Sequence, residues 1–173
     1  MIVVYCLIAF VVFLLLIALV LPSSYTISKT ITVGAKIEDC YEKIANLNNY
    51  KDWNPWAQIE PNAIGVISGS PNTIGHQYTW DGKKIGTGGL TIVKINQPFS
   101  LELELDFLKP FKSKAIDNWL FEQLENNQVK ITWTNKGELK FPMARLIGPM
   151  INKNLNQQFE KGLQNIKVLC EKK

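Results

Sequence analysis

The sequence predicts an α+β protein: an antiparallel sheet of about six to seven strands packed against a long C-terminal helix, and preceded by a transmembrane helix. Three observations predict this fold class. Residues 1–21 contain no Asp, Glu, Lys or Arg. Much of the stretch 24–135 alternates apolar and polar residues in short runs, as strands do. Residues 146–169 place apolar side chains mostly three or four positions apart, which is the period of an amphipathic helix.

Residues 1–22 are the first predicted unit, a membrane anchor. At about 1.5 Å per residue, the 21 apolar positions span roughly 30 Å as a helix, the thickness of a bilayer's hydrocarbon core. Pro22 then ends the run. A cleaved signal peptide is the alternative, but it needs a basic start, a shorter apolar core and an Ala-x-Ala-like site. Cys6 lies near the start of the run and not after it, which argues against a lipoprotein.

Charge near the span indicates which side of the membrane the rest of the chain occupies. Lys29 and Lys36 follow the apolar segment, whereas only the terminal amine precedes it. Basic residues close to a span favour the cytoplasmic side. These two lysines therefore predict a single-pass membrane protein whose C-terminal domain is cytoplasmic.

Residues 24–173 are predicted to form one domain, long enough for a hydrophobic core. Cys40 and Cys170 show no CxxC pairing, and His76 is the only histidine, so we expect no metal site and no cofactor. The two cysteines can meet in space, and apolar packing is the role expected of both.

The net charge of +4 does not indicate nucleic acid binding. The lysines are scattered, Arg145 is the only arginine, and no basic run is interleaved with aromatic residues. We therefore expect no nucleic acid partner.

The first elements of the domain are predicted to be a strand, a short helix and a corner. Residues 24–33 alternate as a strand does, with Lys29 as the one polar exception on the apolar face. Residues 37–47 carry apolar side chains at helical spacing. In the corner 50–58, YKDWNPWAQ, Pro55 prevents a continuous helix.

Six further strands are predicted to follow the corner. They cover residues 64–68, 75–80, 86–95, 99–107, 114–124 and 128–135. Asp81-Gly82 and Asn126-Asn127 mark turns between consecutive strands. Strands joined by short turns pair antiparallel. Leu101, Leu103 and Leu105 alternate with acidic residues, which indicates one buried and one solvated face.

The last segment changes to a helical period. Its apolar stripe runs from Leu146 to Leu169, and Gly148-Pro149 is expected to delay or kink its start. A helix with such a stripe has to bury it, and the apolar face of the sheet is the surface available.

Four motifs, in their order along the chain, resemble those of a known family. They are W-N-P-W at 53–56, Y-T-W-D-G at 78–82, V-K-I-T-W at 129–133 and F-E-K-G-L-Q-N-I-K at 159–167. Together with the order of elements from about Tyr25 to the end, they resemble the START-like, or SRPBCC, superfamily, and most closely its polyketide cyclase/dehydrase-type branch. Membrane-anchored members of that branch are similar in having an apolar N-terminal segment.

The resemblance implies a helix-grip fold, in which a curved sheet and the long helix enclose a cavity. It also implies binding of lipids, sterols, polyketides or other apolar molecules, with catalysis in some members. No catalytic signature of the branch carries over residue by residue, so the resemblance implies a fold and not a reaction.

The candidates for ligand contact are large aromatic side chains and the histidine. They are Trp53, Trp56, His76, Tyr78, Trp80, Trp119 and Trp133. Aromatic side chains with one polar atom both fill cores and line apolar sites. Packing is the alternative for each one alone, but together they are expected to line a partly aromatic cavity.

Three side chains are candidates for acid/base chemistry. An imidazole titrates near neutrality, so His76 is the first, and its alternative is a partly exposed histidine near a strand start. Asp117 and Glu122 lie on one predicted strand but on opposite faces of it. The sequence leaves open which of these two faces inward.

Three functions from different classes fit these observations. The first is a membrane-anchored domain that binds a small hydrophobic or lipid-like ligand between sheet and long helix, since such ligands partition into bilayers. The second is a cyclase, dehydrase or hydrolase-type enzyme on an apolar substrate, with His76, Tyr78 or a buried carboxylate as the acid/base. The third is a non-catalytic membrane interaction module with a collapsed cavity. The sequence leaves the choice between binding and catalysis open.

Overall fold

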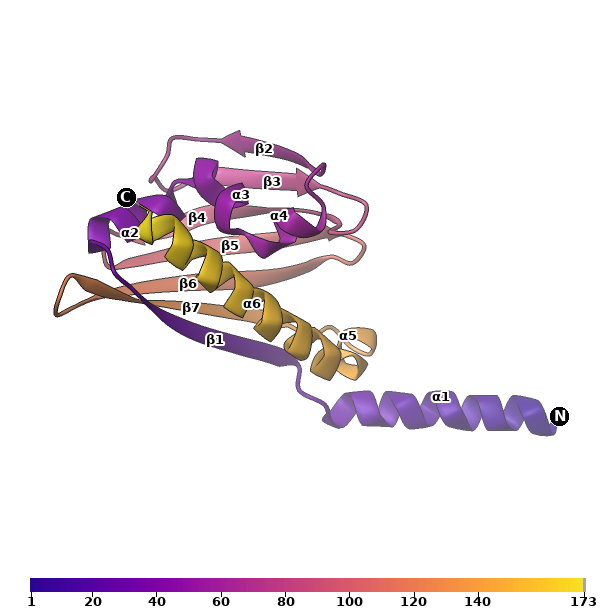
Figure 1. Cartoon of the computed structure of the whole chain (residues 1–173). Coiled ribbons are helices and arrows are strands. Elements are labelled where there is room, and N and C mark those ends of the chain that lie inside the picture. The colour runs from indigo at the N-terminus through magenta and orange to yellow at the C-terminus, as the bar shows by residue number, and fades with distance from the viewer. Residues whose placement is uncertain (173) are drawn as a thin grey trace.

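An apolar helix projects from one end of an α+β domain (Figure 1). The computed structural model describes residues 1–172. Helix α1 (Ile2–Val20) is almost wholly exposed, and α6 (Gly148–Glu171) lies across a seven-stranded antiparallel sheet. The predicted fold class is therefore confirmed, with all seven strands in a single sheet.

The strands follow the predicted runs closely. They are β1 (Ser24–Val33), β2 (Ile64–Ser68), β3 (Gln77–Asp81), β4 (Thr87–Asn96), β5 (Ser100–Lys109), β6 (Ser113–Leu124) and β7 (Gln128–Glu138). Their order in the sheet is β1-β7-β6-β5-β4-β3-β2, so the first strand pairs with the last. Consecutive strands from β2 to β7 are joined as simple neighbours, as short turns require.

The strand register brings several chain connections to one end of the sheet. Ser24 at the start of β1 pairs with Glu138 at the end of β7, and Lys109 at the end of β5 pairs with Thr87 at the start of β4. The β3–β4 loop, the β5–β6 turn and the β7–α5 connection therefore leave the sheet at the end where α1 joins it. We call this the α1 end of the sheet.

The core lies between the concave face of the sheet and α6. Phe159, Leu163 and Ile166 on the helix stripe are buried there. Burying side chains of this size stabilises the fold by about 1.5–3 kcal/mol each. Lys29, the exception in the β1 pattern, forms an ion pair with Glu160 of α6. Its charge is thus matched by the helix that covers its strand.

The predicted short helix is confirmed as α2 (Ile37–Ala45). The corner that follows it consists of shorter elements that the sequence pattern did not resolve: the 3-10 turn Leu47–Asn49, α3 (Tyr50–Trp53) and α4 (Pro55–Ile59). Asn54 starts α4, because its Oδ1 accepts hydrogen bonds from the N–H groups of Trp56 (2.9 Å) and Ala57 (3.2 Å). Pro55 fits the first helical position, where no N–H is needed.

Helix α6 packs unusually close to this corner at Gly162. A Cβ there would lie 2.9 Å from Cζ3 of Trp133 and 3.2 Å from Cδ of Pro55. Asn165, one turn further on, donates a hydrogen bond from Nδ2 to the carbonyl of Trp53 at 3.0 Å. The corner is therefore fixed to the helix at two successive turns.

Helix α1 is long and apolar enough to cross a membrane. Its last turn is the part that packs on the domain: Ala18 is fully buried, and its carbonyl accepts a hydrogen bond from Nη1 of Arg145 at 3.4 Å. Arg145 belongs to α5 (Met143–Leu146), a short helix just before α6. The predicted delay at Gly148-Pro149 is confirmed, since α6 begins at Gly148 as a separate helix.

Cys40 on α2 and Cys170 near the end of α6 lie beside each other as free, buried thiols. They meet in space, and both pack within the core cluster, as the sequence led us to expect.

Candidate functional site

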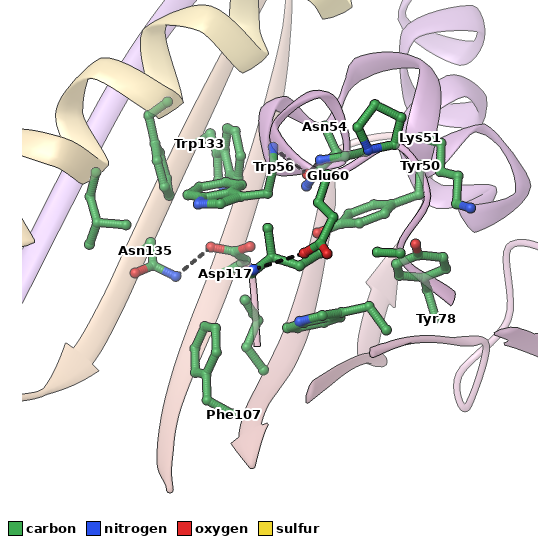
Figure 2. Close-up of a pocket in the computed structure, with 18 of the residues that line it drawn as sticks. Tyr50, Lys51, Asn54, Trp56, Glu60, Tyr78, Phe107, Asp117, Trp133 and Asn135 are labelled. Carbon is green, nitrogen blue, oxygen red and sulfur yellow. Dashed lines mark hydrogen bonds between the residues drawn. The ribbon is translucent and has the colours of Figure 1, made fainter. Parts of the chain in front are cut away.

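A partly enclosed pocket of about 150 Å³ lies between the corner, α6 and the concave face of the sheet (Figure 2). Its walls are mainly apolar and aromatic, formed by Trp56, Trp80, Leu105, Phe107, Leu155 and Phe159. Asp117 and Asn135 supply a buried polar group on the sheet side. An apolar pocket with a few convergent polar groups is the usual form of a small-molecule site.

Strand pairing explains why two polar residues meet at this point. Asp117 on β6 and Asn135 on β7 are directly opposite each other in the register, and both face inward. Asn135 Nδ2 donates a hydrogen bond to Asp117 Oδ1 at 2.7 Å. The question of which face of β6 points inward is therefore answered: Asp117 is buried, whereas Glu122 is exposed and forms an ion pair with Lys130.

Asp117 has an unusual acidity for a carboxyl group. Burial disfavours its charged form and raises its pKa to about 7, although the hydrogen bond from Asn135 and the nearby N–H of the Trp133 indole oppose the shift. The Trp133 Nε1–H lies close enough to lower the pKa but lacks the geometry of a normal hydrogen bond. Near neutral pH, Asp117 therefore exists in both protonation states and can donate or accept a proton.

Two tyrosines of the pocket stay protonated at the same pH. Burial and the nearby Asp117 raise the pKa of Tyr25 to about 12. Burial, Asp117 and Tyr78 raise the pKa of Tyr50 well above its usual value. Their hydroxyl groups therefore remain available as hydrogen-bond donors, and their rings extend the aromatic wall.

Two further donors line the pocket without a protein partner. Neither Trp133 Nε1 nor Asn54 Nδ2 has a hydrogen-bond acceptor within residues 1–172, and both atoms are buried. The orientation of the Asn54 amide is set by the cap of α4, which occupies its oxygen and leaves its NH₂ free. Leaving a buried donor unpaired costs about 1–3 kcal/mol. A ligand with an acceptor atom would remove that cost.

A carboxylate closes one side of the pocket. Glu60, just after α4, accepts hydrogen bonds from the backbone N–H groups of Lys83 (2.9 Å), Lys84 (2.8 Å) and Ile85 (3.2 Å) in the β3–β4 loop. The bond from Lys84 leads those that lower the pKa of Glu60, so the carboxylate stays charged. Glu60 and Ile85 both line the pocket, so these hydrogen bonds join two segments of its wall (Figure 2).

Four of the seven predicted contact residues line this pocket: Trp56, Tyr78, Trp80 and Trp133. Trp53 and Trp119 lie behind it in the core. The ring centroids of Trp119 and Trp133 are 4.4 Å apart and stacked, and Trp53 meets Trp133 edge-on at 5.7 Å. These two indoles support the wall that Trp133 presents.

His76 lies outside the pocket lining and is fully buried, so the alternative of a partly exposed histidine was wrong. Its Nε2 accepts the backbone N–H of Leu47 at 3.0 Å, and its Nδ1 lies 3.1 Å from the carbonyl of Ser68, to which it donates. Both ring nitrogens are thus engaged by backbone groups. The imidazole joins the corner to the β2–β3 loop and has no free nitrogen for a substrate.

The sequence prediction missed Tyr25, Tyr50, Asn54, Glu60 and Asn135 as pocket residues. One of them carried a usable signal. Asn135 shares the face of Val129, Ile131 and Trp133 on its strand, so it is a polar residue on an apolar face. Such a residue needs a buried partner, and the facing strand provides Asp117.

No candidate metal centre is present: within residues 1–172, no group of three or more His, Cys, Asp or Glu side chains could hold an ion. This agrees with the chemistry of the pocket, which has a single buried carboxyl group. Its polar atoms are arranged for hydrogen bonding to a ligand.

Comparison with known proteins supports the fold. No protein-family model and no curated protein matches the sequence. Solved structures that resemble it include a Chromobacterium violaceum protein (TM-score 0.63, 12% identity, 86% of this chain and 98% of that chain). Another is a Helicobacter pylori protein (TM-score 0.65, 10% identity, 85% and 88%).

The Aha1 dimer of Colwellia psychrerythraea is similar to a comparable extent, with a TM-score of 0.60 and 16% identity over 85% of this chain and 96% of that one. At such identities the likeness concerns the fold alone. The curved antiparallel sheet, the long C-terminal helix and the pocket between them show that residues from β1 onward adopt the helix-grip fold.

Proposed function

We propose that this protein is a membrane-anchored binding domain for a small apolar molecule that carries an oxygen atom able to accept hydrogen bonds. One observation supports this above the others. The aromatic pocket holds two buried N–H donors, on Asn54 and Trp133, that have no partner within residues 1–172. A purely hydrocarbon ligand would leave both donors unpaired, whereas a carbonyl, ether or hydroxyl oxygen would satisfy at least one.

The pocket size limits the ligand. A cavity of about 150 Å³ in another protein binds a single aromatic ring, and this pocket encloses about 150 Å³. A ring or a short chain segment therefore fits, and a longer lipid would extend through the mouth. Of the lipid-like ligands expected from the sequence, the small, ring-sized ones suit the site best.

The anchor fits the same function. Apolar molecules concentrate in bilayers, and a domain tethered by α1 would meet them there. The resemblance in sequence to membrane-anchored polyketide cyclase/dehydrase-type proteins points in the same direction. The cytoplasmic side of the membrane remains the proposed location of the domain.

The proposal can be tested by native mass spectrometry of the full chain, purified from membranes into lipid nanodiscs. We expect a bound small molecule to be retained by the wild type. The Ala57→Trp variant should lose it, because Ala57 lines the pocket. The Gln58→Trp variant should keep it, because Gln58 is exposed on the same helix and lies outside the lining. An empty wild-type protein, or equal retention by both variants, would contradict binding in this pocket.

Catalysis is a second candidate function, and the pKa of Asp117 favours it. A carboxyl group with a pKa of about 7 is suited to general acid/base work at neutral pH. We propose Asp117 as the group that would take a proton from the carbon beside a ligand carbonyl. Cyclase and dehydrase reactions begin with such proton transfers.

This candidate is tested by deuterium exchange. Cyclohexanone in D₂O exchanges the protons beside its carbonyl, and a catalytic base in the pocket accelerates that exchange. The wild type should accelerate it, and the Asp117→Asn variant should not. Exchange no faster than in buffer would leave binding as the only function proposed for the pocket.

A further inference from the structure

The α1 end of the sheet carries a distinct set of exposed side chains. We propose that this end is a docking face that lies on the anionic headgroups of a phospholipid bilayer; this rests on the membrane anchoring proposed above. The docking face comprises the β3–β4 loop (82–86), the β5–β6 turn (110–112) and the β7–α6 connection (139–147).

The position of α1 supports this orientation. Helix α1 has 19 residues, which at about 1.5 Å each span roughly 29 Å. The hydrocarbon core of a bilayer is about 30 Å thick, so the whole helix is needed to cross it. Yet its last turn packs on α5, through Ala18 and Arg145. Helix α5 therefore lies at the level where the span ends. Figure 1 shows α1 leaving the domain in the direction in which the β3–β4 loop and α5 also face.

The charged side chains of the docking face are all positive. Its three segments contain five basic residues and no Asp or Glu: Lys83, Lys84, Lys112, Lys140 and Arg145. None of the five forms an ion pair with a carboxylate within residues 1–172.

Three acidic side chains beside the docking face are already engaged, whereas Glu138 at the end of β7 is exposed and forms no ion pair within residues 1–172. Glu60 accepts the N–H groups of the β3–β4 loop, Asp106 pairs with Lys114, and Asp81 accepts a hydrogen bond from Thr87. The lysines that do form ion pairs lie in strands or in α6, and not in the three segments. The free positive charge at this end therefore suits anionic headgroups.

Exposed apolar side chains occupy the same face. Phe111 is 79% exposed at the tip of the β5–β6 turn, and Met143 on α5 is 64% exposed. Phe141, Ile147 and Met150 are exposed nearby on the chain. Aromatic and apolar side chains flanked by lysine are typical of surfaces that sit in the headgroup region.

Two residues that line the pocket lie at this end of the sheet. Ile85 belongs to the docking face and lines the pocket, and Phe107 lines it just before the β5–β6 turn. A ligand passing between bilayer and pocket would then have a short path beside the headgroups. The docking face and the pocket thus lie on one path for a ligand that moves between the bilayer and the protein.

Photocrosslinking of the full chain in phosphatidylcholine vesicles containing phosphatidylserine tests the docking face. Benzoylphenylalanine is incorporated in place of Phe111 or, as the matched control, in place of Phe99. Phe99 is also an exposed phenylalanine in a hairpin turn, but it lies at the opposite end of the sheet. We expect phospholipid adducts by mass spectrometry at position 111 and few or none at 99.

Charge is tested in the same assay. Lys84→Glu combined with Lys112→Glu should lower the adduct yield at 111 several-fold, whereas Lys36→Glu combined with Lys161→Glu should not. Equal adducts at 111 and 99, in protein that resists alkaline extraction, would overturn the docking face and leave the anchor intact. Release of the protein by alkaline extraction would overturn the anchor and the docking face together.

Discussion

Asp117 links the stability of the domain to pH. Its pKa is raised from 3.8 to about 7 in the folded protein, so between these values the folded state binds more protons than the unfolded chain. Stability from this group is therefore fully present below about pH 4 and is lost as pH rises to about 7. The full change is on the order of 4 kcal/mol, from a shift of 3.8 to about 7.

We predict that Asp117→Asn removes this pH dependence. The amide keeps an oxygen for the bond from Asn135 but carries no charge at any pH. Denaturant unfolding of wild type and variant between pH 4 and 8 should show the wild type losing free energy of unfolding relative to the variant as pH rises. Glu104→Gln, on the exposed face of β5, is the control and should run parallel to the wild type. A parallel curve for Asp117→Asn would contradict the raised pKa.

Asn54 has two roles that a substitution can separate. Its oxygen caps α4, and its NH₂ faces the pocket without a partner. Asn54→Asp keeps the capping oxygen and removes the donor. We predict that affinity for an oxygen-bearing ring such as cyclohexanone falls about tenfold, since a hydrogen bond to a buried donor is worth about 1–3 kcal/mol. Affinity for methylcyclohexane, measured in the same titration, should change far less.

At the scale of elements, Glu60 holds the β3–β4 loop against the end of α4. We predict that Glu60→Ala speeds hydrogen exchange at the amides of Lys83, Lys84 and Ile85, because each loses its acceptor. Exchange in β7 should stay unchanged. Glu125→Ala, in the exposed β6–β7 turn, serves as the control. Protection that survived Glu60→Ala would show that the loop is held by other contacts.

The close approach of α6 to the corner gives a second prediction at this scale. Gly162→Val places branched carbons against Trp133 and Pro55, where even a Cβ would be 2.9 Å from the indole. Overpacking of this kind costs about 1–3 kcal/mol. Lys161→Val, one residue away on an exposed position, adds the same branched side chain without the clash. It lowers helix propensity whereas Gly162→Val does not, so propensity alone would make Lys161→Val the more destabilising change. A loss no greater at Gly162 than at Lys161 in thermal unfolding would contradict the tight contact.

Most strands were predictable because they have one buried face. The alternation at 24–33 matches the observed limits of β1. The run 64–68, bounded by turn residues, matches β2, although its side chains are mostly exposed. The same reasoning did not show which face of β6 is buried, because Ile116 and Leu120 put apolar side chains on its outer face too. Only pairing with β7 shows that Asp117 faces inward.

The sequence pattern also failed to predict features that are too short to show a period or that depend on residues distant in the sequence. The helices at 50–59 are each about one turn long, too short for a period to show. The burial of His76 depends on Leu47 and Ser68, whose backbone groups only the fold brings to the imidazole. The pocket was expected from the resemblance, but its polar end follows from strand register.

At the scale of the whole molecule, the proposed anchor, the proposed docking face and part of the pocket lining lie at one end of the fold. Helix α1 meets α5, and α5 follows the end of β7. Phe107 of β5 and Ile85 of the β3–β4 loop line the pocket near the same end of the sheet. A membrane-anchored receptor for a small apolar molecule would use such an arrangement. The proposed function is therefore tested most directly by measuring what the pocket binds.

Nuclear magnetic resonance of residues 24–173 with cyclohexanone and methylcyclohexane tests this claim most directly. The fragment retains every residue that lines the pocket, from Tyr25 to Phe159. We predict that both rings enter, that cyclohexanone binds more tightly, and that it alone strongly shifts the Trp133 indole and Asn54 side-chain N–H signals. If the two rings bound equally with those signals unmoved, or if neither bound, the proposed oxygen-recognising pocket would be contradicted.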